Sequence, residues 1–367
     1  MNIAFYANDV SLLAGTERAT FQVANELAKH SDIKVFIFST VGERQDIKMA
    51  LDNRIEVVSL NYVNRYFGYF NNILKLNKLL KKYEINHFIT VEMMSILFTL
   101  PTIIFRNKSR SNFKYYAWEH FNYTVDLGRS IRSLCRKMAA KFADGIIVLT
   151  ERDVEQWRSN VKINGKIENI SNPCSMEIVP RQYPVQNNNI IAVGRLTYQK
   201  GFDILLSIWK DFLNQYEVPK EWMLQIVGDG EDKQKLLTFI EEHTLGDRVE
   251  LISNTSDIKS LYLNSSFLAM TSRFEGLPMT LIEAQTLGLP IIAFDCITGP
   301  AEVVTEGTGY LIPYDDSELF KAKLFDLISS DTDRSKMSVE AFKQAQRFKS
   351  SQIGSRWIEF LRCVSND

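Results

Sequence analysis

Two glutamates in the second half of the sequence have a type and spacing that suit the binding of a polar ligand. Glu275 and Glu283 have seven residues between them in the segment 271–284, which follows an apolar run typical of a strand. Pro278 marks the start of a helix, whose free N–H groups can receive a phosphate. Glu275 then lies in the loop and Glu283 inside the helix, so both can accept hydrogen bonds from one extended polyol. A solvated pair is the alternative, which the apolar neighbours of Glu283 disfavour.

Two cations stand five residues apart in an earlier loop. Arg195 and Lys200 belong to the segment 194–201, which follows a second strand pattern and opens a helix. Arginine offers a planar fork and lysine a mobile point charge, so this loop can wrap a diphosphate. Two solvated loop charges are the alternative. The segment 228–231, Gly-Asp-Gly-Glu, permits close approach of a ligand to the backbone, but it is also an ordinary turn between a strand and a helix.

Three further residues have structural as well as functional interpretations. Thr298, beside Gly-Pro, can cap a helix or take part in the site, and both interpretations remain open. His120 follows a strand that ends at Glu119, where the loops at the carboxyl ends of strands meet a binding site. The alternatives are that His120 is only a structural residue, or that Glu119 has the more important role. Gly15 opens an amphipathic helix, but its loop lacks the glycines of a dinucleotide fingerprint, which disfavours an NAD-dependent enzyme.

The elements that position these residues follow a regular alternation. Short β-branched or aromatic runs alternate with helical periodicity, as in parallel sheets covered by helices on both faces. In the first half we expect strands at 3–7, 35–39, 56–60, 87–91, 115–119 and 146–149, and helices at 16–29, 71–83, 129–142 and 151–160. In the second half we expect strands at 190–194, 223–227, 249–252, 267–270 and 290–294, and helices at 202–213, 231–242, 257–264, 280–286, 300–304 and along 317–364.

Length and composition indicate two domains in a reducing compartment. With 367 residues, 45% of them hydrophobic, the chain can bury more than one core, and the non-periodic segment 173–189 is the predicted linker. The four cysteines are far apart and indicate neither a zinc site nor disulfides. The N-terminus reads as a strand and not as a signal peptide. The apolar stretch 93–105 contains Pro101 and is shorter than the roughly 20 residues that span a bilayer, so we expect a cytoplasmic protein.

Charge is distributed unevenly along the chain. Residues 1–182 carry 25 Lys and Arg against 18 Asp and Glu, whereas residues 183–367 carry 18 against 26. An aromatic-rich segment, 62–70, precedes a basic helix whose cations are mostly expected on one face: Arg129, Arg132, Arg136, Lys137 and Lys141. Together they predict peripheral contact with an anionic membrane, with a solvated helix and a core-packing loop as the alternative. The absence of a reader motif and the net charge of −1 argue against nucleic-acid binding.

On these residues the chain resembles the retaining glycosyltransferases of the GT-B fold known as glycosyltransferase family 4, or glycosyl transferases group 1. Its E-x7-E signature corresponds to Glu275 and Glu283, and its paired Arg and Lys to Arg195 and Lys200. The resemblance covers essentially the whole chain. One departure is Ala14 before Gly15, where family members usually have two glycines.

The resemblance implies a fold and a set of roles. The fold is α/β, with two Rossmann-like α/β/α domains facing each other across a cleft: an acceptor-binding domain at 1–180, a nucleotide-sugar-binding domain at 181–345, and a C-terminal helix at 346–367 that packs back on the first. Glu275 and His120 are the implied catalytic residues, with Glu275 on the donor sugar. Arg195 and Lys200 are implied to neutralise the diphosphate, and Glu283 to bind the ribose. The full implied donor-binding set also includes residues whose backbone approaches the donor: Gly15, Arg195, Lys200, Gly276, Leu277, Pro278, Met279, Thr280 and Glu283.

The predicted function is transfer of a hexose or N-acetylhexosamine, with retention, from a nucleotide sugar to a glycan or lipid-linked acceptor in bacterial surface polysaccharide biosynthesis. UDP is the nucleoside diphosphate expected in the donor, from its frequency in the family. No metal or other cofactor is expected, because two fixed cations and a helix N-terminus can supply the positive charge that the leaving diphosphate needs. The alternatives are a non-catalytic scaffold or partner subunit that binds sugar nucleotides, and a sugar-nucleotide epimerase.

Overall fold

The computed structural model divides the chain into two compact units. Unit 1 comprises Met1–Ser175 together with Lys349–Asp367, and unit 2 comprises Met176–Phe348. The structure describes residues 1–12, 14–60, 68–106, 112–126, 128, 130–174, 176 and 188–365, with the backbone alone at 68–70, 105 and 106. The predicted linker and the aromatic segment 62–70 therefore lie largely outside the described residues, as does Arg129.

Unit 1 contains a seven-stranded parallel sheet with the order β3-β2-β1-β4-β5-β6-β7. Its strands are β1 (Asn2–Asp9), β2 (Lys34–Val41), β3 (Glu56–Ser59), β4 (His87–Val91), β5 (Lys114–Trp118), β6 (Gly145–Val148) and β7 (Lys166–Asn169). The central strands are apolar on both faces, as expected for a parallel sheet that is covered on both sides.

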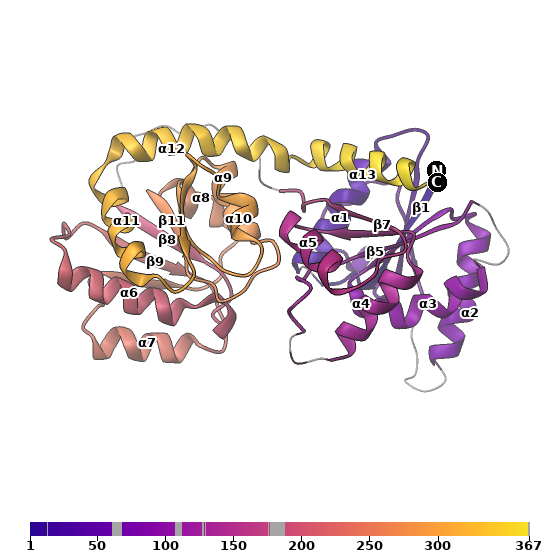
Figure 1. Ribbon diagram of the computed structural model, residues 1–367, viewed down its shortest axis with the longest axis horizontal. Coiled ribbons are helices and arrows are strands. Elements are labelled where there is room, and N and C mark those ends of the chain that lie inside the picture. Colours follow the sequence, from indigo (N-terminus) through magenta and orange to yellow (C-terminus); the bar gives the residue numbers. More distant parts are fainter. Residues whose placement is uncertain are drawn as a thin grey trace. The chain divides into compact units, whose positions relative to one another are not determined.

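Helices cover both faces of this sheet (Figure 1). They are α1 (Gly15–Ala28), α2 (Gly68–Lys82), α3 (Ile96–Arg106), α4 (Ile131–Phe142), α5 (Glu151–Asn160) and α13 (Ser350–Ser365). Helices α2 to α5 share a core with one set of alternate strand residues, which includes Tyr6 and Tyr115. Helix α13 covers the opposite face, where the Trp357 ring lies 6.0 Å from Phe5 and 4.7 Å from Trp118.

Unit 2 contains a six-stranded parallel sheet with the order β10-β9-β8-β11-β12-β13. Its strands are β8 (Asn189–Val193), β9 (Met223–Val227), β10 (Val249–Ile252), β11 (Phe267–Met270), β12 (Ile291–Asp295) and β13 (Gly309–Pro313). Its helices are α6 (Phe202–Gln215), α7 (Lys233–Glu242), α8 (Ile258–Leu263), α9 (Met279–Thr286), α10 (Pro300–Val303), α11 (Ser317–Ser329) and α12 (Asp331–Gln344).

In both sheets the strand order reverses beside the first strand of the unit. The chain moves from β1 to β2 on one side and later places β4 on the other, and β8 has β9 and β11 in the same positions. In open α/β sheets, ligands bind outside the carboxyl ends of the strands at such a reversal. The loops after β1, β4, β8 and β11 are therefore the expected positions of ligand-binding sites.

Three elements differ from the sequence expectations. The apolar stretch around Pro101 forms α3, a helix that the pattern did not reveal because proline usually breaks helices. Strands β7 and β13 are also additional; β7 reads Lys-Ile-Glu-Asn, with one apolar side chain in four. Within the described part of the chain, no helix is long and apolar enough to cross a membrane.

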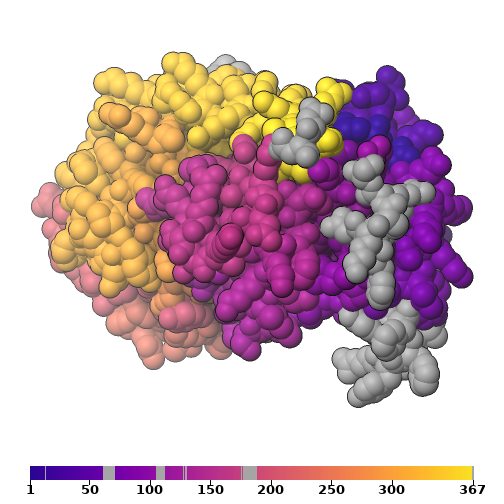
Figure 2. Space-filling view, turned by 45° about the vertical axis from the view of Figure 1, so that its right-hand side comes forward, coloured from indigo at the N-terminus to yellow at the C-terminus, as the bar shows by residue number. Residues whose placement is uncertain are grey.

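The end of the chain belongs to the same unit as its beginning. Helix α13 packs against α1, and the yellow C-terminal residues meet the indigo N-terminal ones at the surface of unit 1 (Figure 2). Gly354 makes this close packing possible, because a Cβ at this position would lie 2.8 Å from Cβ of Glu26. The first unit is therefore completed by residues that follow unit 2 in the sequence.

Candidate active site

The loops after β8 and β11 bring one predicted cation, Lys200, and one predicted carboxylate, Glu275, into contact. Nζ of Lys200 lies 2.7 Å from Oε1 of Glu275, and the Glu275 side chain is almost completely buried. Arg195 is exposed and forms no ion pair or hydrogen bond with the residues that the structure describes. The strand reversal therefore places an ion pair and a further cation at one edge of the sheet.

Glycines allow these loops to approach one another. Gly201, with a φ of 65°, precedes α6, and a Cβ there would lie 2.2 Å from the carbonyl oxygen of Thr271. A Cβ on Gly228 would lie 1.9 Å from the carbonyl oxygen of Gly194. The close approach that Gly228 permits is therefore between its own backbone and the backbone of Gly194, and not between the backbone and a ligand.

An ion pair that sequence reasoning missed connects the two loops. The guanidinium of Arg273 donates to both carboxylate oxygens of Asp203 at 2.9 and 2.8 Å, and also to the carbonyl of Tyr198 at 2.8 Å. The Arg273 backbone N–H donates to the carbonyl of Gln199. The hydrogen bonds from Arg273 lower the pKa of the Asp203 carboxyl group. Arg273 thus holds the loop of Lys200 against the loop of Glu275.

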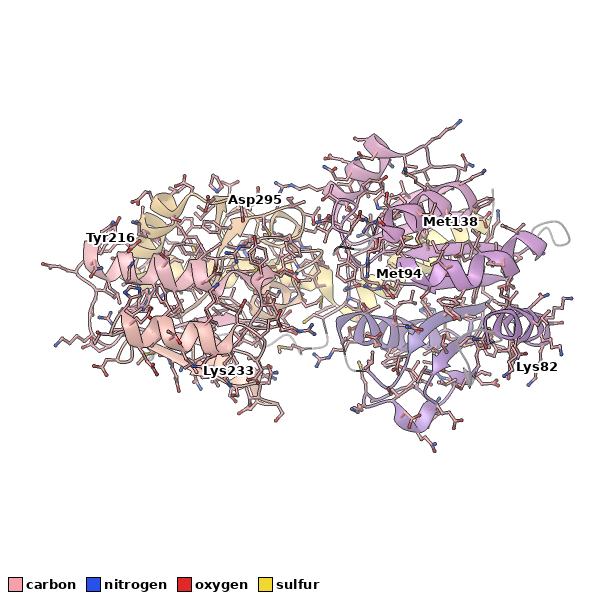
Figure 3. All side chains as sticks on the ribbon, turned by 90° about the horizontal axis from the view of Figure 1, so that it is seen from below. Lys82, Met94, Met138, Tyr216, Lys233 and Asp295 are labelled. Carbon is pink, nitrogen blue, oxygen red and sulfur yellow. The ribbon has the colours of Figure 1, made fainter. Side chains whose placement is uncertain are left out.

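The loop after β12 supports Glu275 from another side; the end of this strand is marked by Asp295 in Figure 3. The Thr298 hydroxyl donates to the carbonyl of Glu275 at 2.7 Å, and Thr298 has a φ of 59°, which is uncommon for a residue other than glycine. Gly299 is the N-cap of α10, and no side chain in the described part of the chain caps that helix. The hydroxyl of Thr298 therefore orders the loop of Glu275 and does not cap α10.

Helix α9 begins directly after this loop. Pro278 is its N-cap, one position before the helix, and the first N–H groups of any helix have no intrahelical acceptor. The segment Gly276, Leu277, Pro278, Met279 and Thr280 thus forms the N-terminus of a helix beside the Lys200–Glu275 pair. Glu283 lies farther along α9, where Oε2 accepts a hydrogen bond from the Tyr262 hydroxyl at 3.1 Å.

Unit 1 places a second set of residues at its own strand reversal. Gly15 is the first residue of α1 and is exposed, and a side chain there would meet open space. Glu92 follows β4 with a φ of 69°, and its Oε1 lies 2.9 Å from Nη2 of Arg132. Burial raises the pKa of Glu17, and the negative charges of Glu92 and Asp9 add to this effect. Sequence reasoning missed Glu92, because a positive φ outside glycine leaves no signal in the sequence.

His120 is buried at the end of β5. Burial lowers the pKa of its imidazole to about 3, so the ring is neutral near pH 7. Its Nε2 has no hydrogen-bond partner among the residues that the structure describes, and its ring centroid lies 4.5 Å from that of Trp118. Neighbouring Glu119 accepts from the backbone N–H groups of His120 and Phe121 and from the guanidinium of Arg136 at 3.0 Å. Glu119 therefore orders the loop in which His120 stands.

The expectation of a basic face on α4 is wrong. Arg136 is 1% exposed and binds Glu119, Asp126 and two backbone carbonyls, and Arg132 is 4% exposed. The exposed residues of α4 are a mixture of apolar and basic side chains, which we call the α4 surface: Ile131, Leu134, Lys137 and Lys141. Periodicity did not separate buried from exposed arginines, because the ion-pair partners come from distant loops.

Comparisons with known proteins agree with this architecture. The family described as Glycosyl transferases group 1 matches residues 178–344. The amylovoran biosynthesis glycosyltransferase AmsD of Erwinia amylovora is 33% identical over 361 residues, covering 96% of this chain and 97% of that protein. The lipopolysaccharide 1,6-galactosyltransferase of Escherichia coli (strain K12) is 27% identical over 326 residues, covering 83% and 82%.

The fold has counterparts among solved structures. The apo form of the lipopolysaccharide outer core galactosyltransferase WaaB superposes with a TM-score of 0.77 at 24% identity, covering 97% of this chain and 98% of that one. This likeness shows the fold, whereas the 33% identity to AmsD over nearly the full length shows that the two proteins belong to one family. The chain therefore belongs to the glycosyltransferase family described as Glycosyl transferases group 1, and its two parallel α/β units are those of the GT-B fold.

Proposed function

We propose that this protein is a retaining glycosyltransferase that moves a hexose or N-acetylhexosamine from a UDP-sugar to a glycan or lipid-linked acceptor of a bacterial surface polysaccharide. The observation that carries the proposal is the ion pair of Lys200 and Glu275 beside the N-terminus of α9, at the strand reversal of unit 2. This arrangement combines positive charge for a diphosphate with a carboxylate for sugar hydroxyls.

The donor would bind by exchange of ion pairs. The diphosphate would take Lys200 from Glu275 and would also receive the guanidinium of Arg195 and the free N–H groups of α9. Glu275, released from Lys200, would then accept hydrogen bonds from the donor sugar. Glu283, oriented by the hydroxyl of Tyr262, would accept hydrogen bonds from the ribose. These charges would stabilise the leaving diphosphate without a metal ion.

The acceptor would bind at the strand reversal of unit 1. Its hydroxyl group would attack the anomeric carbon on the face from which the diphosphate leaves, and the leaving phosphate oxygen would take the hydroxyl proton. His120 would contribute as a neutral hydrogen-bonding group, because its lowered pKa makes a charged imidazolium costly. The pair of Glu92 and Arg132, which follows the strand reversal of unit 1, offers an acceptor and a donor for sugar hydroxyls.

The cellular setting of the proposal is the cytoplasmic face of the membrane. The α4 surface combines two exposed apolar residues with two lysines, which is the composition of surfaces that rest on anionic lipid. Relatives support the choice of acceptor: one is named for amylovoran biosynthesis and another as a lipopolysaccharide galactosyltransferase.

Calorimetric titration with UDP and with GDP in EDTA tests the donor site. We expect metal-free binding of one nucleotide, and we expect the Arg195→Ala/Lys200→Ala variant to lose about 1.5–3 kcal/mol for each charged partner removed. An affinity unchanged in the double variant would remove these residues from the site. Binding of neither nucleotide would favour the non-catalytic scaffold, and conversion of the donor sugar without an acceptor would favour the epimerase.

A further inference from the structure

A cavity in unit 1 lies apart from the candidate active site. It has a volume of about 530 Å³ and is formed by the end of α5, the segment that leads into β7, and α13. The segment enters the amino end of β7, whereas Gly15 and His120 follow the carboxyl ends of their strands. The cavity therefore opens at the far edge of the sheet, and its volume falls within the range of roughly 300–1,000 Å³ that is usual for small-molecule sites.

The lining of this cavity is positively charged. Four cations contribute to it, Arg158, Lys162, Lys166 and Arg356, against the two carboxylates Glu168 and Glu359. Nη2 of Arg356 lies 3.3 Å from Oε1 of Glu168, so these two charges neutralise one another. Arg158 and Lys162 are exposed and form no ion pair with any described residue. An anion that enters the cavity thus meets cations that are not committed to the protein.

One wall of the cavity is apolar. Ile163, Ile167 and Phe360 contribute to it. Ile163 and Ile167 also pack against the core that α2 to α5 share, whereas the Phe360 ring packs edge-on against Tyr116. A site with cations on one side and aliphatic and aromatic carbon on the other fits a ligand that has both an anionic and an apolar part. A free inorganic ion would use the cations alone.

We propose that this cavity binds a phosphate ester. The phosphate group would lie among Arg158, Lys162 and Lys166, because its unesterified oxygens can accept hydrogen bonds from an arginine fork and from ammonium groups at once. The organic part of the ester would lie on Phe360 and its apolar neighbours. The same chemistry is offered by a free phosphorylated metabolite and by a phospholipid headgroup, and both can be tested as ligands.

The cavity contains its own reporter group. Cys363 lines it and is exposed, with Sγ 3.0 Å from Nζ of Lys166, whereas the other three cysteines are buried. A ligand that fills the cavity will shield this thiol from a neutral alkylating reagent such as iodoacetamide. The alkylation rate of Cys363, followed by mass spectrometry on the full-length protein, thus reports occupancy.

The test compares three probes on the same protein. These are inorganic phosphate, n-hexyl phosphate, and vesicles of phosphatidylglycerol with phosphatidylcholine, against vesicles of phosphatidylcholine alone. We expect n-hexyl phosphate to protect Cys363 at lower concentration than inorganic phosphate, because it also uses the apolar wall. Protection by n-hexyl phosphate but not by vesicles would identify a metabolite site, and protection by the anionic vesicles would identify a headgroup site.

Charge reversal distinguishes the cavity from other phosphate sites. In Arg158→Glu/Lys162→Glu we expect the protecting concentration to rise at least about tenfold, because two charged contacts are lost. The matched control Lys220→Glu/Lys336→Glu changes the net charge equally at exposed positions of unit 2 and is expected to retain protection. Protection should also persist in Arg195→Ala/Lys200→Ala, which separates this site from the donor site. Equal protection in the charge-reversed protein, or no protection by any probe, would overturn the proposal.

Discussion

Lys200 and Glu275 are both required by the proposed reaction, yet they bind each other. The 2.7 Å contact joins a lysine to a nearly buried carboxylate, and such charge-assisted contacts are stronger than hydrogen bonds between neutral groups. A donor diphosphate must therefore displace Glu275 from Lys200 before either residue can act on the donor. Removal of the carboxylate charge should consequently affect nucleotide binding and sugar transfer in opposite directions.

Glu275→Gln tests this opposition. We expect kcat to fall by roughly 100–1,000-fold, the usual cost of losing one preorganised hydrogen-bonding group that stabilises a transition state. The affinity for the nucleoside diphosphate should stay equal or increase, because Lys200 no longer has a competing carboxylate. Initial rates and calorimetry on the same preparation measure both quantities, with the exposed Glu306→Gln as the matched control. Retained kcat, or a large loss of nucleotide affinity, would contradict the assigned role.

The sequence predicted part of this site and missed the remainder for identifiable reasons. Arg195, Lys200, Glu275 and Glu283 were found because they follow strand patterns at motif spacing, and the family expected from them is confirmed. Their individual roles stay predictions. Asp203 and Arg273 were not found, because they are 70 residues apart in sequence and meet only when β8 and β11 pair.

At the scale of elements, the donor site consists of two loops that are fastened together. Arg273 makes a two-point contact with Asp203 and also binds the carbonyl of Tyr198. Its side chain is 16% exposed, so solvent screens the pair less than a surface ion pair. The contact fixes the distance between the loop that carries Lys200 and the loop that carries Glu275.

Arg273→Gln should loosen both loops together. We expect kcat/KM for the donor to fall by about 10–100-fold, because small displacements of positioning groups carry costs of this size. KM should change more than kcat if the loops bind the diphosphate, and Arg273→Lys should not restore activity, since lysine cannot make the two-point contact. Lys235→Ala removes another partner of Asp203, 4.0 Å away and 67% exposed, and is expected to have almost no effect. Equal losses in both variants would contradict the argument.

The α4 surface gives a second prediction at this scale. Lys137→Glu/Lys141→Glu should weaken binding to phosphatidylglycerol-containing vesicles by at least about tenfold, since each lysine contributes about 1 kcal/mol near an anionic surface. Vesicle co-sedimentation measures the effect, with Lys220→Glu/Lys336→Glu as the control of equal charge. Binding that does not depend on the anionic lipid or on these two lysines would exclude the surface from membrane contact.

The order of the elements was predictable, and most of their boundaries were close. The hydrophobic periodicity gave a wrong prediction where a residue type that usually breaks helices or faces solvent is instead buried in a helix. Pro101 lies inside α3, where a buried apolar helix tolerates it, and the two arginines of α4 are buried by partners from other loops. Such residues are decided by tertiary contacts, which local periodicity does not contain.

At the scale of the whole molecule, buried histidines make stability depend on acidity. His87 is buried at the start of β4, and burial lowers its pKa to about 4. Above about pH 6.5 the residue is neutral in the folded and unfolded states, so it has no effect on the pH dependence. As the pH falls from about 6.5 to about 4, the unfolded state binds a proton that the folded state does not, so stability is lost.

His87→Gln removes this proton-linked loss. We expect the wild type to lose about 1.4 kcal/mol per pH unit from this residue between about pH 6.5 and pH 4, and the variant to lack that contribution. As the pH is lowered, the unfolding temperature of the wild type should therefore fall more steeply than that of the variant, whatever their difference near pH 7. Scanning calorimetry at a series of pH values measures the two slopes, and parallel curves would contradict the lowered pKa of His87.

The return of the chain to unit 1 has a consequence for biosynthesis. The ribosome completes unit 2 before it adds α13, so the part of the sheet face that receives Trp357 stays uncovered while the whole of unit 2 is translated. At typical elongation rates this interval lasts on the order of 10–40 s. During this time Phe5 and Trp118 belong to an incomplete nascent domain that is open to chaperones and to misassembly. The order of domain maturation is therefore the reverse of the order of synthesis: the domain that is begun first is finished last.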